Sequence, residues 1–476
     1  MKLAVMLTVC RHLVLAGLLI LAPTWMSAAI AQNSFSGASR ADSPDQLASS
    51  LPEEKKELTL RDAAFLALHR NPDLAAFAKE ISALKGITLQ AGLLPNPDLT
   101  LFAENAGNLQ KVNPNRVGVK EVEQQDTSLR ISQLIELGGK RAARVKAATL
   151  NEELANQTYE ARRVDLIAQV ANLFTDVLAA QEQLRFAEES QQLAQKVVDT
   201  VSRRVQTGKV PPIEETKVEV AFSATEIALT QAQRDLASAR KRLALLWASY
   251  SPKFEKVLGN LESEVALPPF EVLVERVLAS PVALRAIKNM EQRKAVLELE
   301  KTRRIPNLTV AAGVLNHSQT GGTTAIVGIT VPLQLFDRNQ GNLLDAHQRV
   351  DKATDEQMAT ELRLRAELIQ AYEALSAAQN EIRILRDKTL PKARSAFEVT
   401  QKGYELGKFG FLEVLDAQRT LFQNQILYVR GLANYQRLVN EIERLIGSPI
   451  NGAPNDINTS AVVGENRAIG DLRSGQ

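Results

Sequence analysis

The stretch KRAARVKAATLNEELANQTYEARRVDLIAQVANLFTDVLAAQEQLRFAEESQQLAQKVVDTVSRRVQT, Lys140 to Thr207, holds 68 consecutive residues without a glycine or a proline. Alanine, leucine, glutamate, glutamine and arginine dominate it, and all of these residues favour helix. An unbroken helix of this length would span roughly 100 Å, whereas an average globular helix has about 11–12 residues. The stretch therefore predicts a long helical rod, which a globular core would not need.

The rod ends at Gly208-Lys209-Val210-Pro211-Pro212, because glycine favours a helix C-cap and proline cannot continue a helix. From Ile213 to Ser251 the chain is again free of glycine and proline. We therefore expect a second long helix that returns along the first, so that the two form a hairpin.

The first 31 residues have the features of a secretory signal peptide. Lys2 and Arg11 supply positive charge, an apolar run follows, and the segment ends in an A-x-A cleavage pattern that places the cut between Ala31 and Gln32. An uncleaved anchor is the alternative, but the apolar run is short for a spanning helix of about 20 residues. Cleavage would also remove Cys10, the only cysteine, and would leave no disulfide and no thiolate ligand.

The composition of the 476 residues narrows the function classes. Without the leader the basic and acidic residues are equal in number, which gives no support for nucleic-acid binding. Aromatic residues make up only 5% of the chain, which suits closely packed alanine-rich helices. No later stretch reaches 18 apolar residues, so we expect no transmembrane helix.

Alternating apolar and polar residues predict two pairs of strands. Leu99, Leu101 and Ala103 alternate with Thr100, Phe102 and Glu104, as in a half-exposed strand, and Leu129 and Ile131 alternate with Ser128, Arg130 and Ser132. The segment from Val310 to Val314 and the one after His317 repeat this pattern. Each pair of strands directly precedes a long helical stretch.

The chain is an internal duplication. Ile131 to Lys140 matches Ile329 to Arg338 at an offset of 198, and Arg204 to Lys209 matches Gly403 to Lys408 at an offset of 199. Each unit consists of a helix, two strands, a very long helix, a tight turn and a return helix.

The predicted organisation follows from these boundaries. A signal peptide (1–31) and an N-terminal tail (32–57) precede the first repeat (58–248), which has strands at 98–105 and 127–137, a long helix at 140–207 and a return helix at 213–248. A connector (249–280) leads to the second repeat (281–447), which has strands at 307–316 and 325–335, a long helix at 342–402 and a return helix at 411–446. A C-terminal tail (448–476) follows. Thr59 is a candidate N-cap for the first helix. Pro391, in the second long helix, should remove a backbone hydrogen bond and bend the helix, and this makes the second repeat the expected moving half of a gate.

Strands of about nine to eleven residues have the length of outer-membrane barrel strands. Four such strands cannot close a barrel, since single-chain barrels start at about eight, and an open edge in lipid leaves backbone groups unsatisfied. Several copies must therefore pool their strands, giving eight in a dimer or twelve in a trimer.

With these features the chain resembles the TolC family of outer-membrane efflux proteins, over the range from about Leu58 to Gly447. Three segments carry a finer likeness to the outer-membrane components of heavy-metal pumps of the cobalt–zinc–cadmium resistance type: Gln90-Ala91-Gly92-Leu93-Leu94-Pro95-Asn96-Pro97, Glu136-Leu137-Gly138-Gly139-Lys140-Arg141 and Leu335-Phe336-Asp337-Arg338-Asn339-Gln340-Gly341. The resemblance implies an α+β membrane protein and a homotrimer, with a twelve-stranded barrel in outer-membrane lipid and an α-helical barrel in the periplasm. It also implies two partners, a periplasmic adaptor (membrane fusion) protein and an inner-membrane RND transporter.

The resemblance further implies a gate at the periplasmic end. Glu413 and Asp416 match a ring of acidic side chains at the family's entrance, and their spacing puts them on one helix face; by spacing alone they could equally be acids at a helix start. Glu214 and Tyr404 match a pair that tethers the closed tip. The family's tip arginine corresponds to Phe409, so a second tether is not expected at that position.

The two hairpin turns match the family's adaptor-contacting tips. They are Thr207-Gly208-Lys209-Val210 and Leu406-Gly407-Lys408-Phe409. The same residues also satisfy a plain helix end, with a glycine at the C-cap and a lysine beside it. Both interpretations can hold together.

We expect no cofactor, no metal site and no catalytic group. His69, His317 and His347 stand alone, without a second ligand at metal-binding spacing. A duct for organic drugs or for secreted polypeptides is the nearest alternative to a heavy-metal duct. A periplasmic coiled-coil scaffold is an alternative of another class, but it would lack the four strands.

Overall fold

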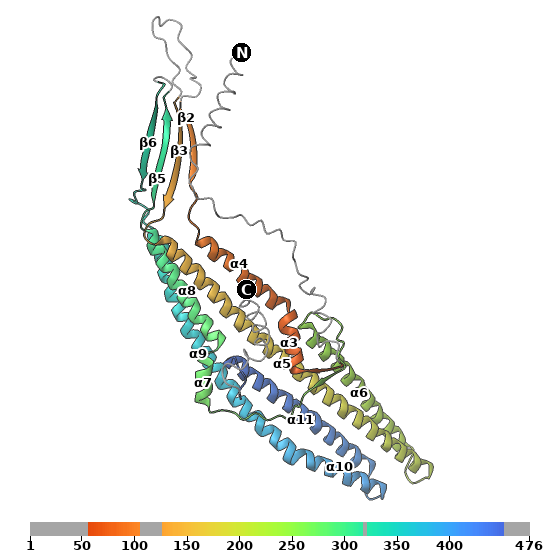
Figure 1. The fold of residues 1–476 in the computed structure, drawn as a ribbon. Helices are drawn as coiled ribbons and strands as arrows, with labels where there is room; N and C mark the ends of the chain where they lie inside the picture. The colour runs from red at the N-terminus through yellow and green to blue at the C-terminus, as the bar shows by residue number, and fades with distance from the viewer. Residues whose placement is uncertain (1–55, 105–125, 318–320, 452–476) are drawn as a thin grey trace, which may run out of the picture. The chain divides into compact units, whose positions relative to one another are not determined.

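A four-stranded antiparallel sheet and a set of long helices make up the computed structural model of the chain, which describes residues 56–104, 126–317 and 321–451 (Figure 1). All of these residues belong to a single unit, Pro52–Gln476. The predicted cleavage site at Ala31 and Gln32 lies outside the described residues.

The elements follow the predicted duplication. The first repeat comprises β1 (Glu57–Thr59), α3 (Leu60–Arg70), α4 (Pro72–Ala91), β2 (Asp98–Glu104), β3 (Asp126–Ile135), α5 (Lys140–Gln206) and α6 (Ile213–Leu245). The connector contains β4 (Lys256–Leu258), and the second repeat comprises α7 (Phe270–Leu278), α8 (Pro281–Arg303), β5 (Leu308–Asn316), β6 (Thr323–Thr330), α9 (Gln340–Ile384), the π-helix η2 (Leu385–Thr389), α10 (Leu390–Glu405) and α11 (Phe411–Ile446).

The helices of each repeat begin at matched caps. Thr59 accepts a hydrogen bond from the Asp62 backbone N–H and completes a capping box, as predicted for an N-cap. Asn71 and Ser280 cap α4 and α8, and both helices start with a proline, which needs no hydrogen-bond acceptor in the first turn. Because β1 pairs in parallel with β4, Leu58 belongs to a short strand, and the first helix starts at Leu60.

The four-stranded sheet runs in the order β2-β3-β5-β6, so the outermost strands β2 and β6 each have one unpaired edge. Its register places Leu101 beside Leu129, and Leu129 beside Val314, on one face. All three side chains are exposed in the single chain. Thr100, Arg130 and Gly313 share the other face. The face that carries Leu101 and Leu129 is therefore largely apolar, whereas the other face mixes polar and small residues with Phe102, Leu315 and Ile326.

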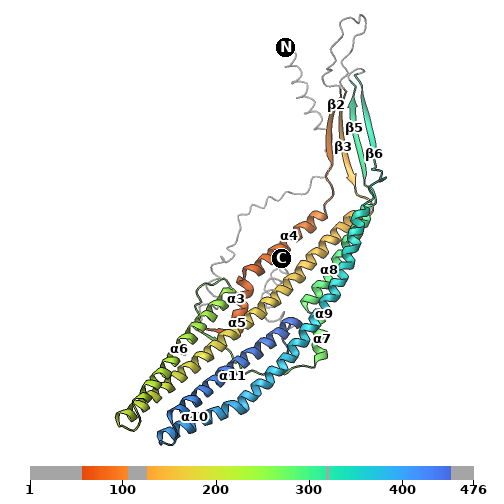
Figure 2. The same ribbon diagram turned by 180° about the vertical axis from the view of Figure 1, so that it is seen from behind.

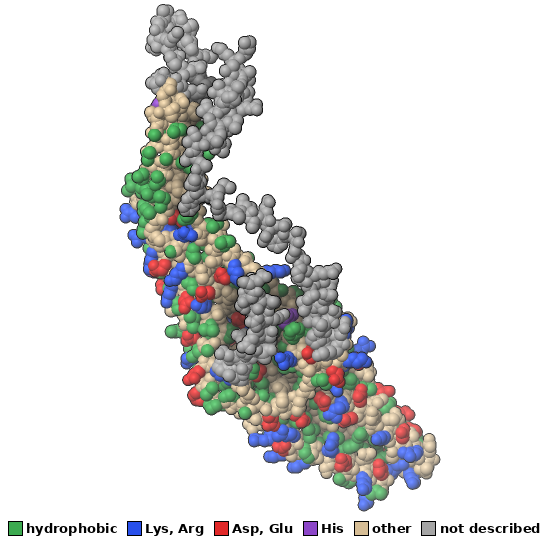
Figure 3. Space-filling model, in the orientation of Figure 1, with side chains coloured by type: hydrophobic (Ala, Val, Ile, Leu, Met, Phe, Trp, Pro, Cys, Tyr) green, Lys and Arg blue, Asp and Glu red, His purple; other side chains and the backbone are tan. Residues whose placement is uncertain are grey.

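The sheet and the long helices differ in the side chains that they present at the surface. In the view of Figure 3, apolar side chains gather over the sheet and its base, and charged side chains appear where the helices begin and continue to the hairpin tips. No helix in the described part of the chain is long and apolar enough to cross a membrane.

Residues Glu136–Arg141 form the junction between the first strand pair and α5, and the geometry of this junction accounts for several of these residues. Gly138 and Gly139 both have positive φ, 73° and 72°, a conformation that glycine adopts without strain. A side chain at Gly138 would overlap Ile305, since its Cβ would come within 2.5 Å of the Ile305 Cδ1. Arg144 donates to Glu136 Oε1 at 2.6 Å and to the Ala91 carbonyl at 2.8 Å, which ties α5 to the end of α4.

The second repeat builds the same junction with different residues. Asn339, the N-cap of α9, has φ 61°, whereas the N-cap of α5 is a glycine, Gly139; asparagine tolerates this conformation better than most residues. Its side-chain amide donates to the Glu300 carbonyl and to Glu300 Oε2, at 3.0 and 2.7 Å. Lys140 of the first repeat donates to Asn307 of the second, so the two junctions also hold each other.

The observed element ends depart from the expected ones where local chemistry intervenes. The strand expected at 325–335 spans Thr323–Thr330, and Pro332, which follows, has no N–H to donate to a ladder. The strand expected to reach residue 137 ends at Ile135, before the glycine pair. The return helix α6 ends at Leu245, three residues before Ala248, which has φ 58°.

A large hydrophobic core lies mainly in the second repeat, around the connector. It packs α7, α9 and α11 against one another, with Leu273, Leu368 and Ile442 fully buried. The connector contributes Leu261 to the same core. Near its C-terminal end, away from the hairpin tips, α11 also contacts α5 of the first repeat, where Arg437 donates to Asp176 Oδ1 at 2.6 Å. The two hairpins are thus joined along part of their length.

Candidate functional site

The two hairpin turns lie near each other at the far end of the helices from the sheet, in both views (Figures 1 and 2). Gly208 and Gly407 adopt positive φ, 66° and 74°. In each turn the lysine N–H donates back to the helix, from Lys209 to Arg204 and from Lys408 to Gly403. This is the glycine C-cap geometry expected from the sequence. Both lysine side chains are exposed, and among the described residues neither forms an ion pair.

A small apolar cluster, here called the tip cluster, joins the two hairpins just behind the turns. It consists of the buried side chains Val197, Val201, Val218, Phe397, Tyr404, Phe411 and Val414. They come from α5, α6, α10 and α11, so every long helix that reaches the tips contributes. Burial of these side chains holds the two hairpins together.

Arg204, near the end of α5, makes a direct polar contact between the hairpins at their tips. Its guanidinium donates to the Tyr404 backbone carbonyl and lies over the Tyr404 ring, 4.5 Å from the centroid. Such cation–π contacts contribute about 0.5–2 kcal/mol, depending on solvation. The sequence interpretation did not single out Arg204. The only feature of the local sequence that points to Arg204 is that it is a basic residue in the last turn of α5, and basic residues are common at that position.

The predicted pair Glu214 and Tyr404 lies within the same region. Tyr404 is 4% exposed. Neither its hydroxyl nor the buried Glu214 Oε2 has a hydrogen-bond partner among the described residues. Burial raises the pKa of Tyr404, and the Glu214 carboxylate raises it further, while Arg204 opposes the change. The two groups are therefore close enough to interact electrostatically.

Phe409 has a structural role in the second turn. Its ring lies directly over Gly403, where an added Cβ would come within 2.1 Å of the Phe409 Cδ2. Gly403 therefore permits the ring to close against α10. The absence of an arginine at Phe409 was noted in the sequence, and Arg204 supplies a guanidinium from the other hairpin instead.

Glu413 and Asp416 lie exposed in the first turns of α11. The Glu413 carboxylate folds back over Gly410, so that an added Cβ there would approach Oε2 to 2.7 Å. Neither carboxylate forms an ion pair within the described residues. Both remain available as an acidic pair on one face of the helix.

The second long helix is interrupted in the part nearer its tip. Five residues, Leu385–Thr389, form a π-helix, and α10 begins immediately after it with Pro391 in its first turn. A proline cannot donate the usual helical hydrogen bond and its ring crowds the preceding turn. The π-helix widens the backbone at this point and so accommodates the ring. The sequence predicted a bend at Pro391 but not the π-helix.

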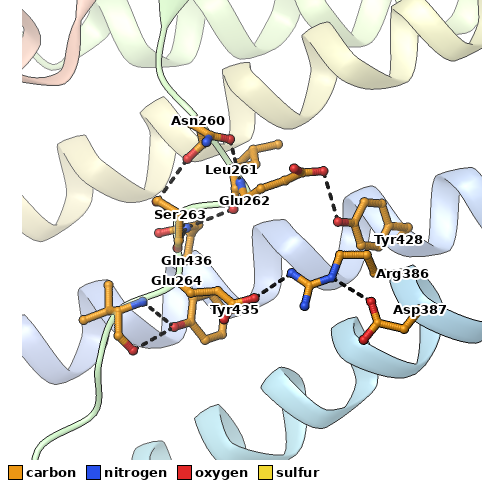
Figure 4. A network of polar contacts seen from close by, with 11 residues as sticks. Asn260, Leu261, Glu262, Ser263, Glu264, Arg386, Asp387, Tyr428, Tyr435 and Gln436 are labelled. Atoms are coloured by element: carbon orange, nitrogen blue, oxygen red, sulfur yellow. Dashed lines mark hydrogen bonds and ion pairs between the residues drawn. The ribbon is translucent and has the colours of Figure 1, made fainter.

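A segment of the connector, Asn260–Val265, here called the belt, crosses the second hairpin beside the π-helix (Figure 4). Arg386 of the π-helix donates to Glu264 Oε1 at 2.7 Å. The Tyr428 hydroxyl of α11 donates to Glu262 Oε1 at 3.0 Å, and Gln436 donates to two belt carbonyls. The belt therefore contacts both helices of the hairpin at the level of the interruption.

Within the described residues no group of three histidine, cysteine, aspartate or glutamate side chains could hold a metal ion. His69 contacts its own helix through the Phe65 carbonyl, at 2.9 Å. His317 lies 3.4 Å from Asp126 Oδ2, at the end of the sheet far from the helices.

The duplicated fold has counterparts among known proteins. The family described as outer membrane efflux protein matches residues 65–249 and 273–448. The chain belongs to the outer membrane efflux protein family. The family resemblance found in the sequence is thus confirmed, as is the expectation that the chain is not an enzyme, because the members of this family are channels.

Two relatives and one solved structure illustrate the range of this outer membrane efflux family. The cobalt-zinc-cadmium resistance protein CzcC of Cupriavidus metallidurans is 36% identical over 390 residues, 82% of this chain and 90% of CzcC. The pyoverdine export outer membrane protein OpmQ of Pseudomonas putida is 26% identical over 397 residues, 76% of this chain and 79% of OpmQ. A crystal structure of CusC superposes with a TM-score of 0.69 at 19% identity, covering 82% of this chain and 92% of CusC, and so shares the fold.

Proposed function

We propose that this outer membrane efflux protein is the exit duct of a tripartite RND-type pump that expels heavy-metal cations. The observation that carries the cargo assignment is the 36% identity to CzcC along nearly the whole of both chains. The duct is passive: the energy comes from an inner-membrane RND transporter, and a periplasmic adaptor protein joins the two.

The sheet supports assembly as a trimer. Its edges β2 and β6 are unpaired, and unpaired backbone groups in lipid are strongly unfavourable. Three chains bring twelve strands together and close the barrel, with the face that carries Leu101 and Leu129 towards lipid. The long helices then form an α-helical barrel in the periplasm.

The tips serve as both gate and docking point. The acidic side chains Glu413 and Asp416 form rings around the entrance in a trimer, and such rings favour cations. The tip cluster and the Arg204–Tyr404 contact hold the entrance closed, with Glu214 facing Tyr404. The turns with Lys209 and Lys408 meet the adaptor.

A duct for organic molecules is the second candidate, because OpmQ, a relative at 26% identity, is described as a pyoverdine exporter. The test is the sensitivity profile of a deletion strain to Co, Zn, Cd, Ni, Cu and Ag ions, beside a panel of dyes and siderophores. We expect sensitivity to divalent metals that a plasmid copy reverses. Sensitivity confined to organic compounds would overturn the cargo assignment and leave the duct in place.

Assembly is tested separately by native mass spectrometry of the protein extracted from outer membranes. We expect a mass of three mature chains. A stable monomer or dimer would contradict the twelve-stranded barrel.

A further inference from the structure

One arginine occupies the middle of the sheet on its polar face. Arg130 lies in β3, directly opposite Thr100 of β2 and Gly313 of β5. It is the only basic residue in the four strands as the structure describes them. Arg130 is exposed, and in these strands and the described residues around them it makes no hydrogen bond or ion pair.

The register decides which way this side chain must face in a membrane. Successive residues of a strand point to opposite faces, so Arg130 lies opposite the face of Leu129 and Ile131, which are 44% and 52% exposed. An arginine on the lipid side near the bilayer midplane is strongly destabilising, whereas leucine and isoleucine suit that side. Arg130 therefore faces the interior of the barrel once three chains close it.

The immediate neighbours of Arg130 on this face leave its side chain uncovered. Ser128 and Ser132 flank it along the strand, and Thr100 and Gly313 lie beside it. Gly313 approaches so closely that an added Cβ would come within 2.3 Å of the Leu129 carbonyl oxygen. The residues directly beside Arg130 are therefore small, and Phe102 and Leu315 lie one register pair away on the same face, on either side of Ser128. The exposed guanidinium extends towards the lumen.

The acidic residues of the same face lie towards the strand ends. Asp98 pairs in register with Ser132 on the helix side, and Glu104 pairs with Asp126 at the other end. Asp126 contacts His317. Arg130 lies between these two levels, and it forms no ion pair with an acid in the part of the chain that the structure describes.

We propose that Arg130 determines the charge selectivity of the membrane barrel. Three copies place a ring of guanidinium groups in the lumen, which disfavours a free cation at that depth and favours anions or metal complexes with anionic ligands. The ring opposes the acidic entrance and so resists the return of free cations from outside. This inference rests on the trimeric duct proposed above.

The test is the reversal potential of the full-length protein in planar bilayers across a KCl gradient. In about 0.01 M salt, where the Debye length is about 30 Å, Arg130→Gln should raise the permeability ratio of K⁺ to Cl⁻ roughly fourfold, by the Coulomb effect of three charges in a wide aqueous pore. In about 1 M salt, where the Debye length is about 3 Å, the difference should vanish.

Three further variants separate charge from structure. Arg130→Lys should retain the wild-type ratio, and Thr100→Gln, which adds an uncharged side chain beside Arg130, should leave it unchanged. Thr100→Arg should move the ratio towards Cl⁻, and it tests the same ring if Arg130→Gln does not assemble.

A wild-type protein that forms no channels would overturn the duct itself. Conducting Arg130→Gln or Thr100→Arg channels with the wild-type ratio in dilute salt would overturn the role of Arg130 alone.

Discussion

The two hairpins come from one duplicated unit, yet only one of them is continuous. In the first, α5 runs for 67 residues without interruption. In the second, the corresponding rod is divided into α9, a five-residue π-helix and α10. The belt crosses the second hairpin at the interruption, where Arg386 donates to Glu264. The duplication thus supplies a rigid hairpin and a jointed one, and we infer that the jointed one moves.

The tips show how equivalent positions have become complementary. In the repeat alignment Arg204 corresponds to Gly403 and Val205 to Tyr404. In the structure Arg204 lies over the Tyr404 ring, and Gly403 makes room for Phe409. A glycine at position 204 could not form the contact with the Tyr404 ring, and an arginine at position 403 would collide with the Phe409 ring, so the two turns cannot carry the same residue there.

The largest effect is expected when a proline is introduced into the first, rigid hairpin. Gln192, exposed on α5, is the repeat equivalent of Pro391. Gln192→Pro should destabilise the first hairpin by about 3 kcal/mol or more, because α5 has no π-helix there to accommodate the ring. Thermal unfolding of the purified protein checks this, with Gln192→Ala as control. An unchanged melting temperature would mean that the two hairpins tolerate a joint equally well.

A smaller loss is expected at the glycine under Phe409. Gly403→Ala places a Cβ 2.1 Å from the ring carbon, and overpacking of this kind costs roughly 1–3 kcal/mol. Gly86→Ala is the matched control, since Gly86 is also helical and has open space around it; it should be neutral or slightly stabilising. Limited trypsin digestion at the tips distinguishes the two variants. Equal protection of both would contradict the packing role of Gly403.

Removing the joint should change motion more than stability. Pro391→Ala restores a backbone donor to the second rod and favours a straight helix. We expect the channel to open less often in single-channel recordings, with the Gln192→Ala channel unaffected. Opening at the wild-type frequency in Pro391→Ala would remove the reason for assigning motion to the second hairpin.

The smallest effect concerns the belt. Burial and the hydrogen bond to Glu262 raise the pKa of Tyr428 to about 12. Because an unfolded tyrosine ionises near 10, the stabilisation from Tyr428 is complete below pH 10 and is lost as the pH rises towards 12. Ultraviolet titration should show a late step that Tyr404 and Tyr428 share; its amplitude should fall by one tyrosine in Tyr428→Phe and stay unchanged in Tyr250→Phe, where the side chain is exposed. An unchanged late amplitude in Tyr428→Phe, or a reduced one in the control, would contradict this assignment.

Much of the fold could be predicted because its signals are local. The absence of glycine and proline marks the rods, and the turns lie at Gly208 and Gly407, where the C-cap geometry is observed. The repeat gave the order of strands and helices, and the alternation of Leu99 and Leu101 indicated which face of the strand is apolar.

The remaining features depend on contacts between distant residues. The π-helix has no sequence signature beyond the nearby Pro391. The parallel pairing of β1 with β4 joins three-residue strands about 200 residues apart, and so short a strand carries no periodicity. The Arg204–Tyr404 contact likewise spans 200 positions, so it appears only when both hairpins are folded side by side. The predicted Glu214–Tyr404 tether stays a prediction.

The most direct test of a gate between the rigid and the jointed hairpin is the single-channel conductance of Arg204→Gln beside wild type, in bilayers at neutral pH. This variant removes the contact with the Tyr404 ring and carbonyl and leaves the tip cluster in place. We expect a higher conductance or more frequent openings than in wild type, and a further increase when Tyr404→Phe and Glu214→Ala are added. Conductance and open probability identical to wild type in all of these variants would contradict a gate held at this contact.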